Sequence, residues 1–389
     1  MHKTRRNRWS QLLNGASAEG LVSRCLLWHP ARDRMSEDGV MGDGRISVLG
    51  EPAAAGFCAG LWAVAGHRVS WHAPARLRQQ FLDHGLELTD RNGLDARIGQ
   101  DVLSCPAEPA ALLQADMVIV CDCPAEAGPE MAAHIARHCR PQIPVLSLRS
   151  RPCIHDPLAV ALPGRAVRAG LLPWEVHGGA AEDRRDRALR FERHGYGPVL
   201  VATADPVEPA PGPDISSLDV RSLDVPCLEV MEQEDVAGRI WGRILTDLAQ
   251  VLEPQAGADR ARALRGAQWR GLAADQLQEA LMVLQQAGIR PVPPSGLPMW
   301  LRLRILQMRG LPDTLVSHLA VWSGRPGWSE VAQPAMASRR DELLRPLLEL
   351  GRRLGVAMPV HEILATQAST ARGGPTTPVA GAILPGDHP

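Results

Sequence analysis

The chain has 389 residues, of which 45% are hydrophobic, and a formal net charge of −1, values typical of a soluble globular protein with about two domains. Only the short cluster of Arg5, Arg6 and Arg8 departs from this near-neutral balance, so the sequence has no basic surface that would indicate nucleic-acid binding. No apolar run reaches the roughly 18 residues of a membrane span, so we expect no membrane association.

The first 44 residues have a basic start but no continuous apolar core, which argues against a signal peptide. We expect them to be a disordered extension, or to lie upstream of the true start, since Met35 and Met41 both precede the first strand. Eight cysteines scattered over a chain without a leader indicate reduced thiols and a cytoplasmic location.

Residues 45–69, RISVLGEPAAAGFCAGLWAVAGHRV, predict a strand, a tight turn, a helix of small residues and a second strand that opens at His67. This is the opening βαβ unit of a dinucleotide-binding sheet. Further strands are predicted at 117–120 and 145–148, separated by a helix over 131–139 that ends before Pro141. Strands that alternate with helices in this way indicate a parallel, doubly wound sheet.

The segment 164–202 is β-rich, with its clearest strand at 199–201, and the proline-rich residues 206–214 predict an exposed loop. From Val236 the hydrophobic period becomes helical. We therefore expect an α/β, Rossmann-like domain over 45–230, an all-α domain over 231–365, and a disordered tail over 366–389. The apolar residues that define the helical faces are Ile240, Trp241, Ile244, Leu248, Val251, Leu252, then Leu277, Leu281, Leu284, and finally Leu343, Leu347, Leu350 and Leu354.

Several short pieces of the chain stand in a fixed order and spacing: RISVLG and AGHRV, HGLELTDRNG at 84–93, ADMVIV at 115–120, AGLLPWEVH at 169–177, GYGPVL at 195–200, WGRILTDLAQVLEPQAG at 241–257, RGLPD at 309–313 and LLELGRRLGVAMPVHEIL at 347–364. Together they resemble the ketopantoate reductases, NADPH-dependent enzymes that reduce a 2-oxo acid during pantothenate synthesis. The resemblance implies NADP as the cofactor if one is bound, a small 2-oxo acid as the substrate, and a homodimer through the helical domain.

The glycine-rich turn of that family departs from its pattern in this chain. The three glycine positions of Gly-x-Gly-x-x-Gly are occupied by Gly50, Pro52 and Ala55, and Glu51 adds a negative charge. Proline has no N–H and brings a ring into the space where a pyrophosphate would approach the backbone. The turn is therefore either a degenerate cofactor site or an ordinary strand-to-helix connection.

Three more cofactor positions follow from the resemblance. Arg76, with Arg78 as an alternative, corresponds to the family's arginine for the 2′-phosphate of NADPH. Cys123 stands where the family has a lysine, and Ser150, followed by Arg151, stands where family members have an Asn-Gly pair.

The catalytic positions are also replaced. The family's catalytic lysine corresponds to Arg243 and its orienting asparagine to Asp247, while Lys3 is the only lysine in the chain. Arginine can clamp a carboxylate but is a poor general acid, because its pKa lies far above the operating pH. The spacing of Arg243 and Asp247 equally suits an i,i+4 ion pair on a helix surface.

The family's serine pair and its Thr-Glu-Ile-Asp stretch align with Pro326-Gly327 and with residues 338–341. Arg339 and Asp341 are the substrate-binding positions that this alignment leaves.

A metal site is the weaker interpretation of the cysteines and histidines around the second predicted strand. Cys121 and Cys123 lack the Cys-x-x-Cys spacing of a zinc knuckle, and His134 and His138 also suit an exposed helix face. We expect no metal site there, although Cys139 adds a further soft ligand.

Three hypotheses follow, the weakest of which is an interaction protein that uses the helical domain as a homodimer surface. The first is a divergent ketopantoate reductase-like protein that has lost ordinary catalysis and acts as a binding or scaffolding subunit. The second is an active NAD(P)H-dependent reductase of a small 2-oxo acid, in which Arg243 clamps the substrate and water supplies the proton.

Overall fold

A computed structural model describes two compact units of the chain, the first ending at Glu234 and the second beginning at Asp235. This division lies close to the boundary that the sequence predicts at residue 230. The N-terminal segment, the proline-rich loop 206–214 and the end of the predicted tail lie outside the described residues. The described residues are 44–150, 156–178, 187–195, 197–203, 220–252, 267–293, 298–308 and 333–370.

The first unit opens with the predicted βαβ element: strand β1 (Arg45–Gly50), helix α3 (Pro52–Val64) and strand β2 (Arg68–Trp71). Proline suits the first helical position, where no intrahelical N–H bond is needed, and the helix consists of small and apolar residues. Every residue of α3 from Ala53 to Ala63 is buried. A helix that is apolar all round belongs inside a core, and α3 packs there.

Seven described strands form a mainly parallel sheet in the order β11-β10-β7-β6-β5-β1-β2. All its pairings are parallel except that of β10 with β7. The predicted strands at 117–120, 145–148 and 199–201 are confirmed, and with them the Rossmann-like fold class. The remaining strands of this sheet are β5 (Met117–Cys121), β6 (Val145–Arg149), β7 (Val167–Leu171), β10 (Val199–Ala202) and β11 (Val230–Gln233).

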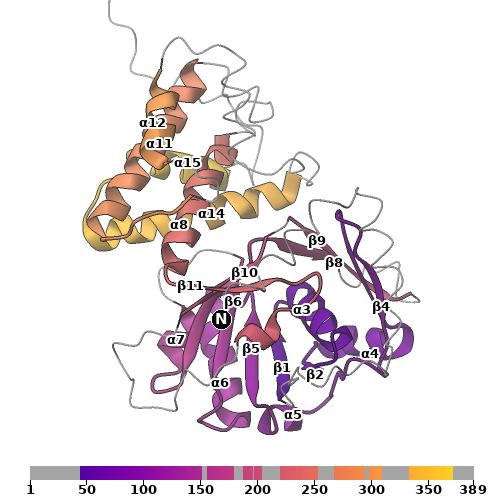
Figure 1. Ribbon diagram of the computed structural model, residues 1–389. Coiled ribbons are helices and arrows are strands. Elements are labelled where there is room, and N and C mark those ends of the chain that lie inside the picture. Colours follow the sequence, from indigo (N-terminus) through magenta and orange to yellow (C-terminus); the bar gives the residue numbers. More distant parts are fainter. Residues whose placement is uncertain are drawn as a thin grey trace, which may run out of the picture. The chain divides into compact units, whose positions relative to one another are not determined.

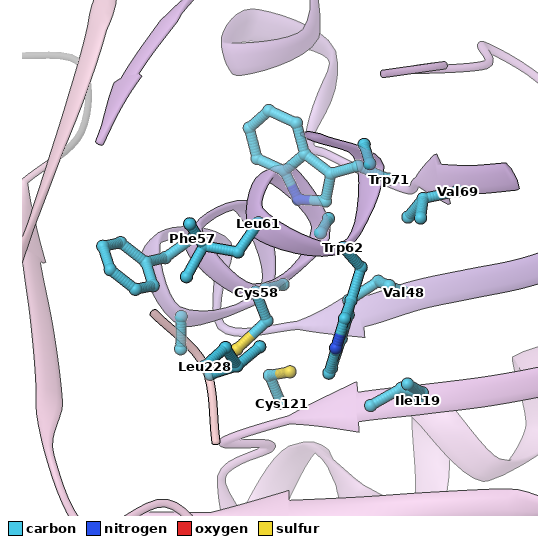
Figure 2. Close-up of a cluster of buried hydrophobic side chains, with 14 of the residues drawn as sticks. Val48, Phe57, Cys58, Leu61, Trp62, Val69, Trp71, Ile119, Cys121 and Leu228 are labelled. Carbon is cyan, nitrogen blue, oxygen red and sulfur yellow. The ribbon is translucent and has the colours of Figure 1, made fainter. Parts of the chain in front are cut away.

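A second, four-stranded sheet in the order β4-β3-β9-β8 packs against α3 in the same unit (Figure 1). The β-rich character of 164–202 is thus divided between two sheets. Figure 2 shows Trp62 of α3 beside Val48 and Ile119 of the first sheet, whereas the ring of Phe57 lies on another side of the helix. The strands of the second sheet are β3 (Leu86–Asp90), β4 (Asp95–Ile98), β8 (Glu175–Gly178) and β9 (Leu189–His194).

The face of the first sheet opposite α3 is covered by short helices. Val118, Val120 and Val145 of the sheet form a core with Ile135 and Leu158 of these helices. The predicted helix at 131–139 is confirmed, although it begins three residues earlier, at Gly128. The helices and turns outside the two sheets are α4 (Ala75–His84), α5 (Ala110–Leu113), η1 (Ala125–Ala127), α6 (Gly128–His138), α7 (Pro157–Ala161) and η4 (Val220–Leu223).

The described part of the second unit is helical, as predicted, and its core contains most of the periodic leucines. The predicted apolar face over 240–252 packs into this core and is built by two elements, since α8 ends at Asp247 and a 3₁₀ turn continues to Leu252. The last helix also runs to Thr370, into the predicted tail. The elements are α8 (Val236–Asp247), η5 (Leu248–Leu252), α11 (Ala267–Gln286), α12 (Met299–Gln307), α14 (Gln333–Leu354) and α15 (Pro359–Thr370).

A buried acid links two of these helices. The carboxylate of Glu279 on α11 accepts hydrogen bonds from the backbone N–H groups of Val360 (2.9 Å) and His361 (3.2 Å) at the start of α15. The same carboxylate lies 2.9 Å from Nδ1 of the fully buried His361. Glu279 therefore satisfies the helix start that would otherwise be left with unpaired donors. Among the described helices, none has the length and apolarity needed to cross a membrane.

Two helical glycines predict opposite effects of the same substitution. A Cβ at Gly56 of α3 would lie 2.5 Å from Phe191 Cε2 and 2.9 Å from Trp71 Cζ2, whereas a Cβ at Gly271 of α11 would have no atom within 4 Å. We expect Gly56→Ala to lower the free energy of unfolding by about 1–3 kcal/mol through overpacking. Gly271→Ala should raise it by about 1 kcal/mol through helix propensity. Urea unfolding followed by circular dichroism measures both, and a stable Gly56→Ala variant would contradict the packing of α3.

His72 makes the stability of the first unit sensitive to acid. Burial, assisted by the nearby His134, lowers the pKa of His72 from 6.5 to about 4. The unfolded chain therefore binds this proton more readily than the folded chain, so stability falls as the pH drops from 6.5 towards 4. The loss should be on the order of 2–3 kcal/mol. Urea unfolding between these pH values measures the effect: the free energy of unfolding of His72→Gln should depend less steeply on pH than that of the unsubstituted protein. His84→Gln, at an exposed position, is the control and should show the same pH dependence as the unsubstituted protein.

Candidate functional site

The candidate site lies at the carboxyl ends of β1 and β5, where the strand order of the first sheet reverses. Ligands of doubly wound sheets bind in the crevice at this point. Gly50 ends β1 with φ +114°, and a Cβ there would lie 1.9 Å from the carbonyl oxygen of Cys121. Glu51 N donates a hydrogen bond to the same oxygen at 2.7 Å. The contact between β1 and β5 therefore requires this glycine even if no ligand binds.

The start of α3 is capped by the protein's own carboxylate. Glu51 Oε2 accepts a hydrogen bond from Ala54 N at 2.7 Å, and Glu51 O accepts one from Ala55 N at 2.8 Å. Pro52 has no N–H to offer. A helix start binds an anion through its unpaired N–H groups and its positive dipole end. In this protein Glu51 supplies that anion. The two bonds do not involve the N–H group of Ala53, which also belongs to the first turn of the helix.

A second acid lies at the adjacent strand end. Asp122 follows β5 with φ 55°, a left-handed conformation that aspartate tolerates better than most residues. Its backbone N–H donates to Leu148 O at 2.7 Å, and its carboxylate accepts hydrogen bonds from the N–H (2.9 Å) and the hydroxyl of Ser150. Ser150, a predicted cofactor position, is thus engaged in holding the ends of β5 and β6 together.

The two carboxylates give the crevice a negative character. The pKa of Cys121 lies well above its usual value, mainly because Cys58 contacts it and because it is buried, and the charges of Asp122 and Glu51 contribute further. Figure 2 shows the sulfur atoms of Cys58 and Cys121 facing each other between α3 and β5. Since both carboxylates act on this one thiol, a diphosphate at the strand ends would meet two like charges.

The other predicted cofactor positions differ in their exposure. Ala55 is 1% exposed and belongs to the core, and Arg76 lies on the exposed side of α4. Cys123 is 2% exposed and packs in the core under α6, on the opposite face of the sheet from α3. Burial raises the pKa of its thiol.

Arg243 and Asp247 lie one turn apart on α8. Arg243 Nε is 3.9 Å from Asp247 Oδ2, and the two side chains are 15% and 14% exposed. This geometry is the i,i+4 ion pair that the sequence offered as the alternative to a catalytic role. A Cβ at Gly242 would lie 1.9 Å from Val292 O, so α8 is closely covered by the chain after α11. The spacing of Gly238 and Gly242 is the sequence signal for that approach.

The predicted substrate residues Arg339 and Asp341 fall within α14, but their side chains lie outside the described part of the chain. Pro326 and Gly327 lie outside it altogether.

The cysteines and histidines near β5 are distributed over both faces of the sheet. Cys121 belongs to the core with α3, whereas Cys123 and Cys139 belong to the core with α6. His134 and His138 pack ring against ring, with centroids 4.9 Å apart. Within the described residues, no group of three or more His, Cys, Asp or Glu side chains is placed to hold a metal ion.

Comparison with known proteins gives similarity in structure only. No protein-family model matches the sequence, and neither does any curated protein. A PanE/ApbA family ketopantoate reductase from Ralstonia eutropha JMP134 is 19% identical, with a TM-score of 0.62 over 84% of this chain and 97% of that one. A 2-dehydropantoate 2-reductase from Methylococcus capsulatus is 18% identical, with a TM-score of 0.58 over 84% and 96%.

A third solved structure carries a cofactor. D-Mandelate dehydrogenase, determined as a complex with NADH, is 15% identical, with a TM-score of 0.59 over 84% of this chain and 98% of that one. At these identities the likeness concerns the fold, and the fold is that of the ketopantoate reductases, as the sequence predicts.

A double-mutant cycle tests whether Arg243 and Asp247 act only on each other. For a partly exposed i,i+4 pair we expect a coupling free energy below about 1 kcal/mol between Arg243→Met and Asp247→Asn, measured by urea unfolding. The coupling should shrink in high salt, which screens the pair. A 2-oxo acid that stabilises the unsubstituted protein but not Arg243→Met would instead identify a substrate clamp.

Proposed function

We propose that this protein is a non-catalytic relative, by fold, of the ketopantoate reductases and that it acts as a binding or scaffolding subunit. The observation that supports the proposal best is the hydrogen bond from Ala54 N to Glu51 Oε2. In a dinucleotide-binding crevice these donors hold the pyrophosphate. A carboxylate that is part of the chain is present at very high effective concentration, so a diphosphate has to displace it and also approach Asp122.

The absence of any lysine other than Lys3 supports the same proposal. Lys3 is the only lysine in the sequence, so no ammonium group from the folded units can protonate a nascent alkoxide. Arginine is a poor proton donor in general, and Arg243 lies beside Asp247. Both requirements of hydride transfer to a 2-oxo acid, a held cofactor and a proton donor, are thus weakened independently.

The second candidate is an NAD(P)H-dependent reductase of a small 2-oxo acid. It is supported by the similar structures, which include ketopantoate reductases and an NADH complex of D-mandelate dehydrogenase. It requires Glu51 to swing away from α3, the dinucleotide to bind beside Pro52, and Arg243 to exchange Asp247 for a substrate carboxylate.

A cofactor titration separates the two candidates. The unsubstituted protein should show no saturable change in tryptophan or nicotinamide fluorescence with NADPH or NADH. The double variant Glu51→Ala/Pro52→Gly removes the internal anion and the ring and restores an N–H, so its NADPH affinity should rise at least about tenfold, equivalent to about 1.4 kcal/mol. Asp95→Ala removes an exposed acid of β4 and serves as the matched control, which should leave binding unchanged.

One result would replace the proposal. Saturable micromolar binding of NADPH by the unsubstituted protein, followed by oxidation of the cofactor on addition of ketopantoate, would identify an active reductase.

A further inference from the structure

A polar cavity of about 270 Å³ lies at the amino ends of β1 and β2. The two strands are parallel, and their register pairs Arg45 with Arg68 and Ser47 with Ser70. Ser70 also pairs with Ser104, which brings a third chain segment beside β2. All five residues line the cavity. Residues two apart on a strand share a face, so the arginines and the serines form two adjacent rows on one face of the sheet.

This face is the one that α6 covers. Ile46 and Val48 of β1 pack in the core with α3, whereas Leu49 packs in the core with α6. Because side chains alternate along a strand, Arg45 and Ser47 share the face of Leu49. The cavity is therefore separate from the crevice at the carboxyl ends of the strands, on which the proposed function rests.

The row of arginines makes the cavity positive. Like charges at paired positions of neighbouring strands repel, and an anion between Arg45 and Arg68 would relieve that repulsion. Gln114 of α5 accepts a hydrogen bond from Arg45 Nη1 at 2.9 Å, which holds the guanidinium at the cavity without adding charge. Among the described lining residues, Asp101 is the one carboxylate. Two guanidinium groups against one carboxylate favour an anionic ligand.

The row of serines places hydroxyl groups beside these charges. Ser47 lines the cavity although it is only 1% exposed, and its Oγ lies 3.4 Å from Nε2 of His72, a long contact for a buried hydroxyl. A serine hydroxyl can donate one hydrogen bond and accept two. Neighbouring strands lie about 4.8 Å apart, so the hydroxyls of Ser47 and Ser70 can both reach one tetrahedral oxyanion.

The number and kind of donors select the ligand. A carboxylate has two oxygens and a single charge, whereas a phosphate monoester has three terminal oxygens and a charge of about −1.5 to −2 at pH 7. Two guanidinium groups and two neighbouring hydroxyls match the phosphate better. A volume of about 270 Å³ is near the lower end for ligand pockets and suits a small molecule. We propose that the Arg45–Arg68 and Ser47–Ser70 pairs bind the phosphoryl group of a small phosphate monoester.

Calorimetric titration of the full chain with glycerol 3-phosphate tests the proposal. The unsubstituted protein should bind this probe saturably, whereas glycerol alone should give no saturable heat. Arg45→Met and Arg68→Met should each weaken binding about tenfold or more, because each removes a charge-assisted hydrogen bond. Arg97→Met is the matched control: Arg97 is also an exposed strand arginine, paired with Glu87 at 2.6 Å, but it belongs to the second sheet. Its loss should leave the affinity unchanged.

The imidazole signals of His72 report where the probe binds. Assigned by their absence from His72→Gln, they should shift with glycerol 3-phosphate, because the ring contacts Ser47 at the cavity. The double variant Glu51→Ala/Pro52→Gly, which changes the other end of the strands, should leave this binding unchanged. The present inference and the proposed function therefore fail or succeed separately.

Four results would overturn the inference. No saturable binding of glycerol 3-phosphate would remove the ligand. An equal loss of affinity in Arg97→Met would show attraction to surface charge in general. Acetate or inorganic phosphate bound more tightly than glycerol 3-phosphate would show a site for a simple anion rather than for a phosphate monoester. Binding that leaves the His72 signals unmoved would place the probe elsewhere on the protein.

Discussion

The burial of α3 is the constraint on which the rest of the first unit depends. The helix is surrounded by apolar side chains along its whole length, and Gly56 and Gly60 let aromatic and aliphatic groups of both sheets approach its backbone. Its first residues after Pro52 are buried as well. N–H groups at a buried helix start need partners, and water cannot supply them freely there. A protein of this fold can meet that demand with a bound diphosphate or with a side chain, and Glu51 provides the side chain.

That choice has consequences for the whole crevice. With Glu51 as the cap, the N–H groups of Ala54 and Ala55 have acceptors within the chain, and the carboxylate compensates the dipole of the helix start. Asp122 and Ser150 close the neighbouring strand ends in the same way, by pairing polar groups within the chain. Each of these bonds stabilises the strand ends without help from a ligand, and each would have to be broken or opposed when a dinucleotide binds. Stability without ligand and affinity for ligand are therefore in competition at the same atoms.

The sequence predicted the elements that depend on local pattern, whereas it did not predict the arrangements that depend on contacts between distant parts of the chain. The turn at Gly50, the all-apolar α3 and the strands β5 and β6 follow from composition and period, and the i,i+4 pair of Arg243 and Asp247 follows from spacing. The second sheet was missed because β3 and β4 are separated from β8 and β9 by the whole central part of the first sheet. Likewise nothing local shows that Cys123 lies under α6, or that the carboxylate of Glu51 turns back onto its own helix.

Because the chain has a single lysine, arginine is the residue to consider where a basic side chain is buried in this protein. Arginine keeps its charge in the interior, so each buried guanidinium has to be compensated in place. Arg193 achieves this with Asp90 and the carbonyl oxygen of Cys227, and its guanidinium lies over the rings of Phe57 and Trp174. Arg168 achieves it with Ala202 O and Glu232. Arg149 stands at the carboxyl end of the sheet, where this fold places its ligands, and its Nε and Nη1 have no such partners among the described residues. Arg193 Nε is likewise buried without a hydrogen-bond partner among the described residues, so an unsatisfied Nε occurs in the core of this unit as well as at the strand ends and does not by itself mark a ligand site.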